Sequence, residues 1–475
     1  MRRNPTTLPL LVVVTGVLIT AVDTTIVVLA LPEIQRALHV GISGVVWVII
    51  GYLLVLTVLA TQVGRLGDMF GRVRMYEAGF AVFLLGSLLC ALATSEGTMI
   101  GYRIVQAVGG AFITANSGAV IADIFPPERR GQAYGFNAVG WNVGAILGVL
   151  LGGSITTYLS WRWIFWINLP IGAAALVIAL RVLRDRSPRV AHRLDPAGIV
   201  LLGAGLFGVL WGVTHLATRP LDASLIGYVV GGALLLVLLL VVEARHAEPM
   251  LDLSLFRVPT MTPSLLAALL QSVANFAVLF LLIMYLQGVR GLSPLHASLL
   301  LVPGYLVGGV AGPFAGRLAD RIGPVWPATA GLAVQVAALA IYAQLGTTTA
   351  LAVVVVGSVV NGIGSGGFFP ANNTAVMRVA PPLRYGIASG MLRTFANTGM
   401  VFSYSLAILI AARAVTRKTA FAIFVGSRTL RAPLAHAFVT GMHAALYASM
   451  AFMVGAALLS VSRGRRRRAE AASAL

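Results

Sequence analysis

One acidic residue lies in the middle of a long apolar stretch near the start of the sequence. Asp23 is the only charged residue between positions 8 and 31. An ionised carboxylate at the centre of a bilayer costs roughly 2.5–3.5 kcal/mol on insertion scales, so such a residue faces a bundle interior or a wet cavity. A proton or a cation is its natural partner there. We predict that Asp23 carries protons and contacts substrate; the alternative is a structural hydrogen bond to a neighbouring helix.

Two arginines also lie within apolar stretches. Arg103 comes early in its stretch, so one interpretation is that its long side chain reaches the outer headgroups. Arg393 comes about two turns into its stretch. We predict that Arg393 lines a cavity, or else caps the inner ends of neighbouring helices.

Two polar connectors of similar sequence separate apolar stretches. GRLGDMFGRVRMY spans residues 64–76, and the shorter GRLADRIG spans 316–323. An aspartate at such a place accepts backbone N–H bonds at a helix start or pairs with an arginine, and glycine permits close helix approach and tight turns. We predict a cytoplasmic latch that stabilises an outward-facing state, with the second copy weaker because it lacks the later basic pair; the alternative is a generic basic loop. The latch residues are Gly64, Asp68, Gly71, Arg72, Asp123, Gly316, Asp320 and Arg321.

Aromatic and amide side chains inside apolar stretches are candidates for the wall of a substrate cavity, the alternative being packing against lipid or core. GIGSGGFFPANN (362–373) is not a nucleotide loop, because it lacks a preceding strand and a phosphate-binding lysine. Its glycines favour close helix packing, and Pro370 is expected to kink the helix. The cavity candidates are Trp47, Tyr52, Gln106, Trp141, Asn142, Gln271, Asn275, Phe276, Tyr305, Phe368, Phe369, Asn372, Asn373, Arg393 and Asn397.

The residues give little support for catalysis, metal binding or disulfide formation. No nucleophile–base–acid set is visible, and His443 is the only histidine deep in a predicted helix, where we expect it to pack. Cys90 is the only cysteine, so the chain has no internal disulfide and no cysteine-based metal site. We therefore expect neither an enzyme nor a bound metal.

The elements that position these residues are apolar helices. The chain has 475 residues, of which 58% are hydrophobic and 10% charged, where a soluble domain carries about 25% charged residues. A bilayer core of about 30 Å needs about 20 apolar residues in a helix. We predict an all-α polytopic membrane protein with fourteen transmembrane helices. The stretches are 8–31, 43–63, 76–94, 98–122, 132–157, 163–180, 196–216, 224–242, 261–287, 294–316, 325–345, 349–376, 386–412 and 436–461.

The net charge of +19 is distributed unevenly between the two sides that these helices define. With a cytoplasmic N-terminus, most basic residues fall inside, so the positive-inside rule places both termini in the cytoplasm. Membrane topology and attraction to anionic lipid headgroups then explain the excess of basic residues, and nucleic-acid binding is not needed to explain it. The RGRRRR tail (463–468) fits a membrane-surface anchor.

The chain contains an internal duplication. Gly64 and Gly316 are 252 residues apart, while PPERRG (126–131) and PPLRYG (381–386) are 255 apart, as are Asn142 and Asn397. Three sequence matches in the same order, at nearly the same separation, indicate two parallel six-helix repeats with two extra helices between them. The predicted segments are an N-terminal bundle (1–185), a two-helix insertion (186–258) and a C-terminal bundle with a basic tail (259–475).

The chain resembles the fourteen-helix drug:proton antiporter subfamily of the major facilitator superfamily. The resemblance covers essentially the whole length and rests on GRLGDMFGRVR (64–74), AVDTTIVVLALP (21–32), SWRWIFWINLPIG (160–172) and EPMLDLSLFR (248–257). It implies two six-helix bundles plus two inserted helices.

Two family motifs are incomplete. Arg103 and Gln106 match the second motif, with Ala107 in place of its glycine, and this match implies a role for Arg103 in proton coupling. Val149, in GAILGVLLGG (144–153), stands where antiporters of the family have proline, which weakens the inference of antiport.

The resemblance implies a proton-coupled exporter of amphipathic small molecules, as in multidrug efflux and antibiotic resistance, working by alternating access. The alternative is an exporter or flippase-like transporter of lipids or fatty-acyl compounds, and a non-transporting receptor is the third hypothesis. We expect a monomer in the bacterial cytoplasmic (inner) membrane, with protons, membrane lipids and a small-molecule substrate as partners and no cofactor besides the proton gradient. The basic segment 413–435, with a possible hairpin at Gly426–Ser427, covers the outer vestibule or is a passive loop.

Overall fold

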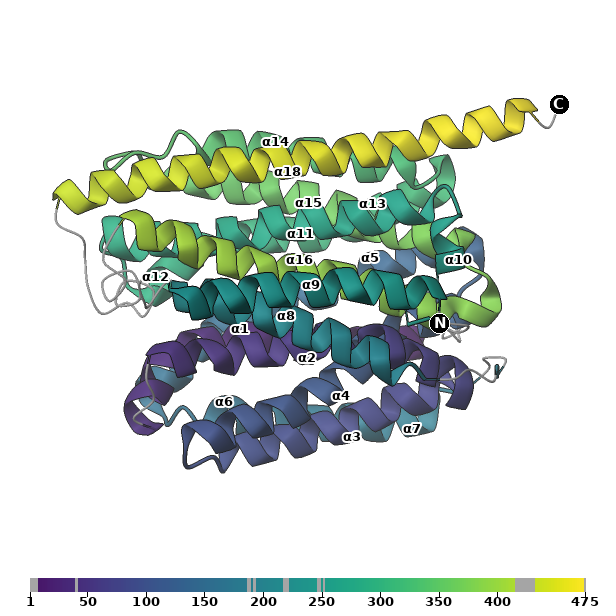
Figure 1. Ribbon diagram of the computed structural model, residues 1–475, viewed down its shortest axis with the longest axis horizontal. Coiled ribbons are helices and arrows are strands. Elements are labelled where there is room, and N and C mark those ends of the chain that lie inside the picture. Colours follow the sequence, from purple (N-terminus) through teal and green to yellow (C-terminus); the bar gives the residue numbers. More distant parts are fainter. Residues whose placement is uncertain are drawn as a thin grey trace, which may run out of the picture.

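The molecule is a bundle of long helices that run roughly parallel or antiparallel to one another (Figure 1). Thirteen helices in the described part of the chain are long and apolar enough to cross a membrane, and α16 (Tyr385–Ala414) has 30 residues. The predicted all-α membrane fold with fourteen long helices is therefore confirmed. The computed structural model describes residues 7–38, 42–185, 189–190, 194–216, 222–245, 249–250, 253–414 and 432–473.

The helices fall into a first set, an inserted pair and a second set. The first set is α1 (Thr7–Leu38), α2 (Ile42–Phe70), α3 (Arg72–Ala91), α4 (Glu96–Ile124), α5 (Arg130–Tyr158), α6 (Trp163–Trp166) and α7 (Asn168–Val182). The inserted pair is α8 (Pro196–Leu216) and α9 (Ala223–Arg245). The second set is α10 (Leu253–Phe256), α11 (Met261–Met284), α12 (Pro294–Leu299), α13 (Val302–Ile322), α14 (Val325–Tyr342), α15 (Leu351–Val379), α16 and α18 (Ala432–Ser473).

Equivalent helices make equivalent contacts in the two sets. In the first, α1 packs on α5 while α2 and α3 pack on α4; in the second, α11 packs on α16 while α13 and α14 pack on α15. Helices α8 and α9 pack on each other, and α8 also touches α2 and α16, so the inserted pair covers one side of the junction between the sets (Figure 1). The residue boundaries of the three predicted segments stay a prediction.

The polar connectors are helix ends and not loops, which corrects the predicted boundaries. Helix α2 continues through GRLGDMF to Phe70, and α3 begins at Arg72. Only Gly71 separates them, with φ of +109°, and Gly323 ends α13 with φ of +90°. Backbone hydrogen bonding carries a helix past the end of its apolar stretch, and a glycine that tolerates positive φ then stops it. We call the end of the bundle that holds Gly71 and Gly323 the connector end.

Two predicted stretches are interrupted. Residues 163–180 divide between α6 and α7, and residues 294–316 divide between α12 and α13. Pro303 lies in the first turn of α13, where its missing N–H costs nothing, so a new helix starts there. Helix α15 continues past Pro370.

Part of the predicted outer segment 413–435 lies outside the described residues, including the hairpin at Gly426–Ser427. The basic tail (463–468) continues α18 as helix.

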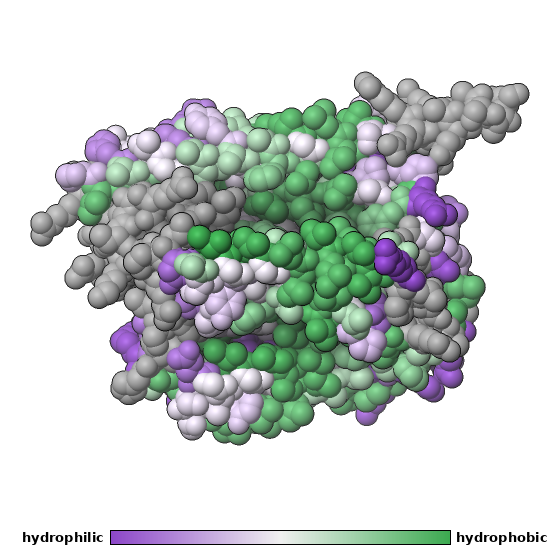
Figure 2. Space-filling view, in the orientation of Figure 1, coloured by the Kyte–Doolittle hydropathy of each residue, from purple (hydrophilic) through white to green (hydrophobic). Residues whose placement is uncertain are grey.

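Figure 2 shows apolar side chains across the middle of the visible face and hydrophilic ones toward its two ends. Large apolar side chains are also well exposed on α13 and α14; Val310, Phe314 and Trp326 are 65%, 63% and 62% exposed. Such a wide apolar surface suits contact with lipid chains.

The two helix sets meet through backbone contacts at the connector end. A Cβ atom on Gly64 of α2 would lie 2.1 Å from the carbonyl oxygen of Gly386 on α16. A Cβ on Gly131 of α5 would lie 2.3 Å from the carbonyl oxygen of Gly316 on α13. The same contact therefore occurs twice, at positions related by the duplication, and neither crossing has room for a side chain.

A methyl group at this crossing should hold the sets apart. Overpacking typically costs about 1–3 kcal/mol, so Gly64→Ala should lower the population with the connector end closed by about tenfold. The hydroxyls of Thr61 and Thr394 lie 2.8 Å apart across the same interface. Disulfide formation in a Thr61→Cys, Thr394→Cys, Cys90→Ser protein measures this population.

Gly51→Ala is the matched control, because Gly51 lies on the same helix with open space where its Cβ would be. Cross-linking should be unchanged in this control. Equal cross-linking rates in the Gly64 and Gly51 variants would contradict the proposed role of the crossing.

Candidate functional site

The acidic residue of the first helix forms a buried ion pair. The Nη1 atom of Arg103 on α4 lies 2.7 Å from Oδ2 of Asp23 on α1, with the two residues 2% and 0% exposed. Gln106 Nε2 donates to Asp23 Oδ1 at 2.8 Å, and Asn168 Nδ2 of α7 reaches the same oxygen at 3.4 Å. Both carboxylate oxygens are therefore occupied.

The guanidinium of Arg103 is held on several sides. Its carbon lies 4.1 Å from the ring centroid of Tyr52 on α2. Its Nε donates to the carbonyl oxygen of Val48 at 3.4 Å, and its Nη1 donates to Gln106 Oε1 at 2.7 Å. Arg103 thus points into the bundle, so the interpretation that its side chain reaches the outer lipid headgroups was wrong. Additional hydrogen bonds of this kind are what a buried ion pair needs to offset its desolvation.

Sequence reasoning missed two members of this network. Asn168 also donates to Ser87 Oγ at 3.1 Å, and Ser87 donates to the carbonyl oxygen of Phe165 at 2.9 Å. From the sequence, Asn168 was used only as part of the family motif SWRWIFWINLPIG. Its amide within an apolar stretch could have marked it as a candidate for the buried network. The network joins α1, α2, α3, α4 and α7 around one carboxylate.

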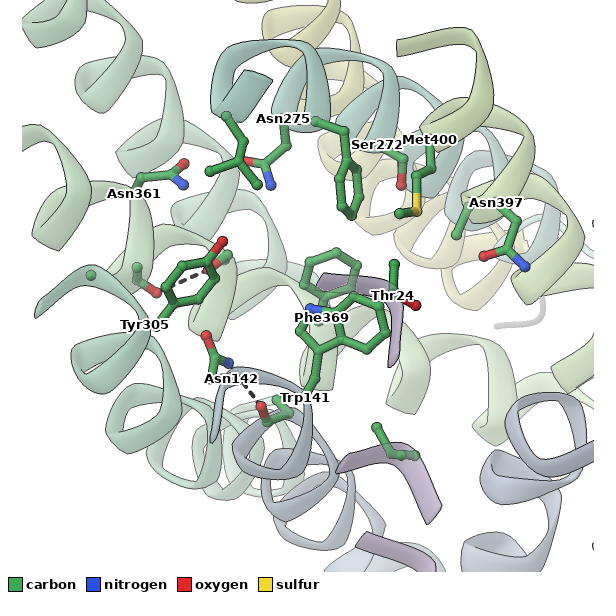
Figure 3. Close-up of a pocket in the computed structure, with 18 of the residues that line it drawn as sticks. Thr24, Trp141, Asn142, Ser272, Asn275, Tyr305, Asn361, Phe369, Asn397 and Met400 are labelled. Carbon is green, nitrogen blue, oxygen red and sulfur yellow. Dashed lines mark hydrogen bonds between the residues drawn. The ribbon is translucent and has the colours of Figure 1, made fainter. Parts of the chain in front are cut away.

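A cavity lies between the two helix sets. It encloses a space of about 1590 Å³, including the part open to solvent. Figure 3 shows Asn142, Tyr305, Phe369 and Asn397 around this space, with Trp141 reaching in from α5. The predicted cavity residues that line it are Trp141, Asn142, Asn275, Phe276, Tyr305, Phe369, Asn373, Arg393 and Asn397.

Six predicted cavity residues lie elsewhere, because neighbours in a helix point about 100° apart. Phe368 and Asn372 are buried while Phe369 and Asn373 line the cavity. Trp47 packs on Phe207 and Trp211 of α8, and Tyr52 and Gln106 belong to the Arg103 network. Gln271 donates to Gln335 at 2.9 Å, and Asn372 donates to the carbonyl oxygen of Ser264 at 3.2 Å.

The cavity also has polar lining residues that were not predicted, among them Thr20, Thr24, Ser272, Asn361 and Ser365. A periodic signal was present on α15, where Asn361, Ser365, Phe369 and Asn373 recur every four residues and share one face. Thr20 and Thr24 have the same spacing on α1, next to Asp23.

The first connector forms a latch between the helix sets. Asp68 accepts the backbone N–H groups of Gly386 and Ile387, at 3.0 and 3.1 Å, at the first turn of α16. Arg72 Nε donates to Asp68 at 2.8 Å, and Arg72 Nη1 lies 2.5 Å from Asp123. A carboxylate at a helix N-terminus satisfies free N–H groups and complements the helix dipole. Asp68 therefore ties the end of α2 to the start of α16.

The second connector forms the equivalent but looser latch. Asp320 accepts the N–H groups of Gly131 and Gln132, at 2.9 and 3.0 Å, at the start of α5. Its ionic partner is Arg378 of α15, at 3.6 Å and 26% exposed, a residue that was not among the predicted latch residues, whereas the predicted latch residue Arg321 takes no part. Arg321 is exposed and makes no hydrogen bond or ion pair with any residue that the structure describes, because it points away from Asp320 on the helix.

Comparison with known proteins places this arrangement in a family. The Major Facilitator Superfamily profile matches residues 13–404 and 264–473. The drug efflux pump JefA of Mycobacterium tuberculosis is 32% identical over 84% of this chain and 79% of that protein. The tetracenomycin C resistance and export protein of Streptomyces glaucescens is 30% identical over 85% of this chain and 76% of that protein.

Solved structures with the same fold include the proton:xylose symporter XylE, with a TM-score of 0.64, 14% identity and 94% of each chain covered. The human organic anion transporter MFSD10 has a TM-score of 0.61 and 17% identity, covering 94% of this chain and 98% of that chain. By its profile match, its relatives and its paired helix sets, this chain belongs to the Major Facilitator Superfamily of membrane transporters.

Proposed function

We propose that the protein exports amphipathic small molecules in exchange for protons by alternating access. The observation that carries this proposal is the buried Asp23–Arg103 pair next to the cavity wall. Asp23 lies on α1 between Thr20 and Thr24, which line the cavity. A proton-binding carboxylate thus sits one layer behind the space in which a substrate would bind.

Protonation of Asp23 would act on the packing of the first helix set. The neutral acid no longer attracts Arg103, whose guanidinium then needs other partners. Because α1, α2, α4 and α7 all contribute to this network, a proton changes contacts on four helices at once. We infer that this change is what couples proton binding to movement of the sets.

In the proposed transport cycle, the two latches control the opening of the connector end. Asp68 and Asp320 hold opposite helix sets together through backbone N–H groups, and the glycine crossings lie beside them. We propose that the structure is the state closed at the connector end, and that this end faces the cytoplasm together with both termini. Opening then requires four carboxylate–N–H bonds to separate.

Several features support an amphipathic substrate. The cavity wall contains both aromatic and amide side chains, and the relatives include a drug efflux pump and a tetracenomycin C export protein. We propose that the protein works as a monomer in the bacterial inner membrane, surrounded by lipid, with the proton gradient as its energy source and without metal, cofactor, nucleic acid or enzymatic activity.

Helix α5 packs closely on α1 although Val149 stands in place of the family's proline. A Cβ on Gly144 would lie 2.5 Å from the carbonyl oxygen of Leu18, and one on Gly148 would lie 2.8 Å from that of Val22. Helices α1 and α5 are therefore in backbone contact beside Asp23. This contact supports retention of antiport despite Val149.

Replacing Asp23 should uncouple transport from the proton gradient. In proteoliposomes with an imposed pH gradient, Asp23→Asn should lower gradient-driven efflux of the neutral amphiphile phenylnaphthylamine by about tenfold or more, in the range of a lost proton-transfer group. Phenylnaphthylamine fluorescence in the membrane measures the efflux. Glu33→Gln is the matched control, because Glu33 is a partly exposed acid on the same helix. Undiminished gradient-driven efflux in Asp23→Asn would refute the assigned role.

The two latches should differ in importance. Asp68 is fully buried and bonded to Arg72, whereas Asp320 has a partly exposed partner 3.6 Å away. Hydrogen bonds to charged groups are worth about 1.5–3 kcal/mol, so Asp68→Asn should slow the same efflux by about tenfold and Asp320→Asn by less. Arg321→Gln should leave the rate unchanged. Equal losses in the two aspartate variants would mean that the latches are equivalent.

A further inference from the structure

One fixed charge remains without a partner on the cavity wall. Arg393 is the only residue with a permanent charge among the described residues that line the cavity. It makes no hydrogen bond or ion pair with any residue that the structure describes. A guanidinium has five N–H donors and is costly to leave unpaired away from water. The cavity therefore contains a cation that its own wall does not compensate.

The wall offers nothing comparable to a cation. No aspartate or glutamate occurs among the described lining residues. Asp23 lies behind the wall at 0% exposure, and its oxygens are already bonded to Arg103 and Gln106. A cationic ligand would be repelled by Arg393 and would find no carboxylate on the described part of the wall, whereas an anionic one would meet an unpaired guanidinium.

Further hydrogen-bond donors line the same cavity. Asn397 lies four residues after Arg393 on α16, so both point to the same side of the helix. Asn397, Asn275 and Asn361 line the cavity (Figure 3) and make no hydrogen bond with any described residue. The amide of Asn397 can donate to a head group at the guanidinium, and the other two amides offer donors elsewhere on the wall.

We propose that the cavity takes amphiphiles with an anionic head group, such as a carboxylate, sulfonate or phosphate. Arg393 binds the head group, and the apolar body lies against Trp141, Phe276 and Phe369. This inference rests on the proposed function, since it names the substrate class of the same site. Fatty-acyl carboxylates, the alternative that the sequence left open, fall within the class.

The position of Arg393 connects the head group to the closed interface. Its neighbour Thr394 donates to the carbonyl oxygen of Thr57 at 3.1 Å and lies 2.8 Å from the Thr61 hydroxyl, both on α2. One turn earlier, a Cβ on Gly390 would lie 2.5 Å from the carbonyl oxygen of Ala60. An anion on Arg393 therefore binds beside the α2–α16 crossing.

A matched pair of probes tests the proposal. Anilinonaphthalene sulfonate and phenylnaphthylamine share one ring system and differ by the sulfonate. Their dissociation constants are measured by calorimetry with the protein in lipid nanodiscs, with protein-free nanodiscs subtracted. Wild-type protein should bind the sulfonate at least about tenfold more tightly than the neutral probe, as expected for a charge-assisted bond. Equal affinity of the wild-type protein for both probes overturns the proposal.

Variants of Arg393 assign the selectivity to one side chain. Arg393→Gln should weaken sulfonate binding by about tenfold and change neutral binding by less than about twofold, as expected for loss of a charged hydrogen bond. Arg393→Lys should retain the preference for the sulfonate, and Arg181→Gln should leave both affinities unchanged because Arg181 is exposed on α7. An unchanged sulfonate affinity in Arg393→Gln, or an equal loss for both probes, overturns the proposal.

Binding at equilibrium needs no proton gradient, so the two hypotheses fail separately. Loss of sulfonate selectivity with intact gradient-driven phenylnaphthylamine efflux would refute the anion site alone. Intact selectivity without gradient-driven efflux would refute proton coupling alone. If Arg393→Gln does not fold, the comparison of the two probes on wild-type and Arg393→Lys protein still decides, because both must prefer the sulfonate.

Discussion

The high cost of an unpaired charge away from water governs how this protein is held together. Asp23 and Arg103 are buried together and share hydrogen bonds with Gln106. Asp68 and Asp320 take the free N–H groups of helix starts in the opposite helix set. Each of these charges needs residues from several helices, so satisfying them fixes how those helices are arranged. A change at one charge, such as a proton on Asp23, therefore alters the contacts of helices that are far apart in the chain.

Close backbone contact at the crossings makes the latches possible. Only glycine at positions 64, 131, 316 and 386 lets α2 meet α16 and α5 meet α13 at such short range. The carboxylates then reach N–H groups that a thicker crossing would hold out of range. The glycines allow the helices to cross closely, and the aspartates bind N–H groups across each crossing. Both features occur in each of the two repeats. The asymmetry comes from the arginines, since Arg72 is fully buried while Arg378 is partly exposed.

On the cavity wall, a charge is left without a bonded partner in the described part of the chain. Arg103 has an acid, an amide, a carbonyl and an aromatic ring around it, whereas Arg393 has no bonded partner among the described residues. The first arrangement suits a proton site that must remain closed to other ions. The second suits a site whose partner arrives from outside. A transporter that exchanges protons for anionic amphiphiles needs both kinds of environment, separated by one layer of wall residues.

The sequence by itself determined the class of fold, the duplication, the inserted helix pair and the glycines and aspartates of the two latches, because apolar length, offset and local motifs are properties of the chain. It also pointed to Asp23 and Arg103 separately, since each is a charge in an apolar stretch. Only the tertiary structure decided that they pair, that Asn168 joins them, and that Phe369 and Asn373 face the cavity while Phe368 and Asn372 do not. Likewise, Arg378 and not Arg321 completes the second latch. The physical reason is that a partner's identity and a helix's rotation depend on contacts between segments dozens to hundreds of residues apart, which no local pattern specifies.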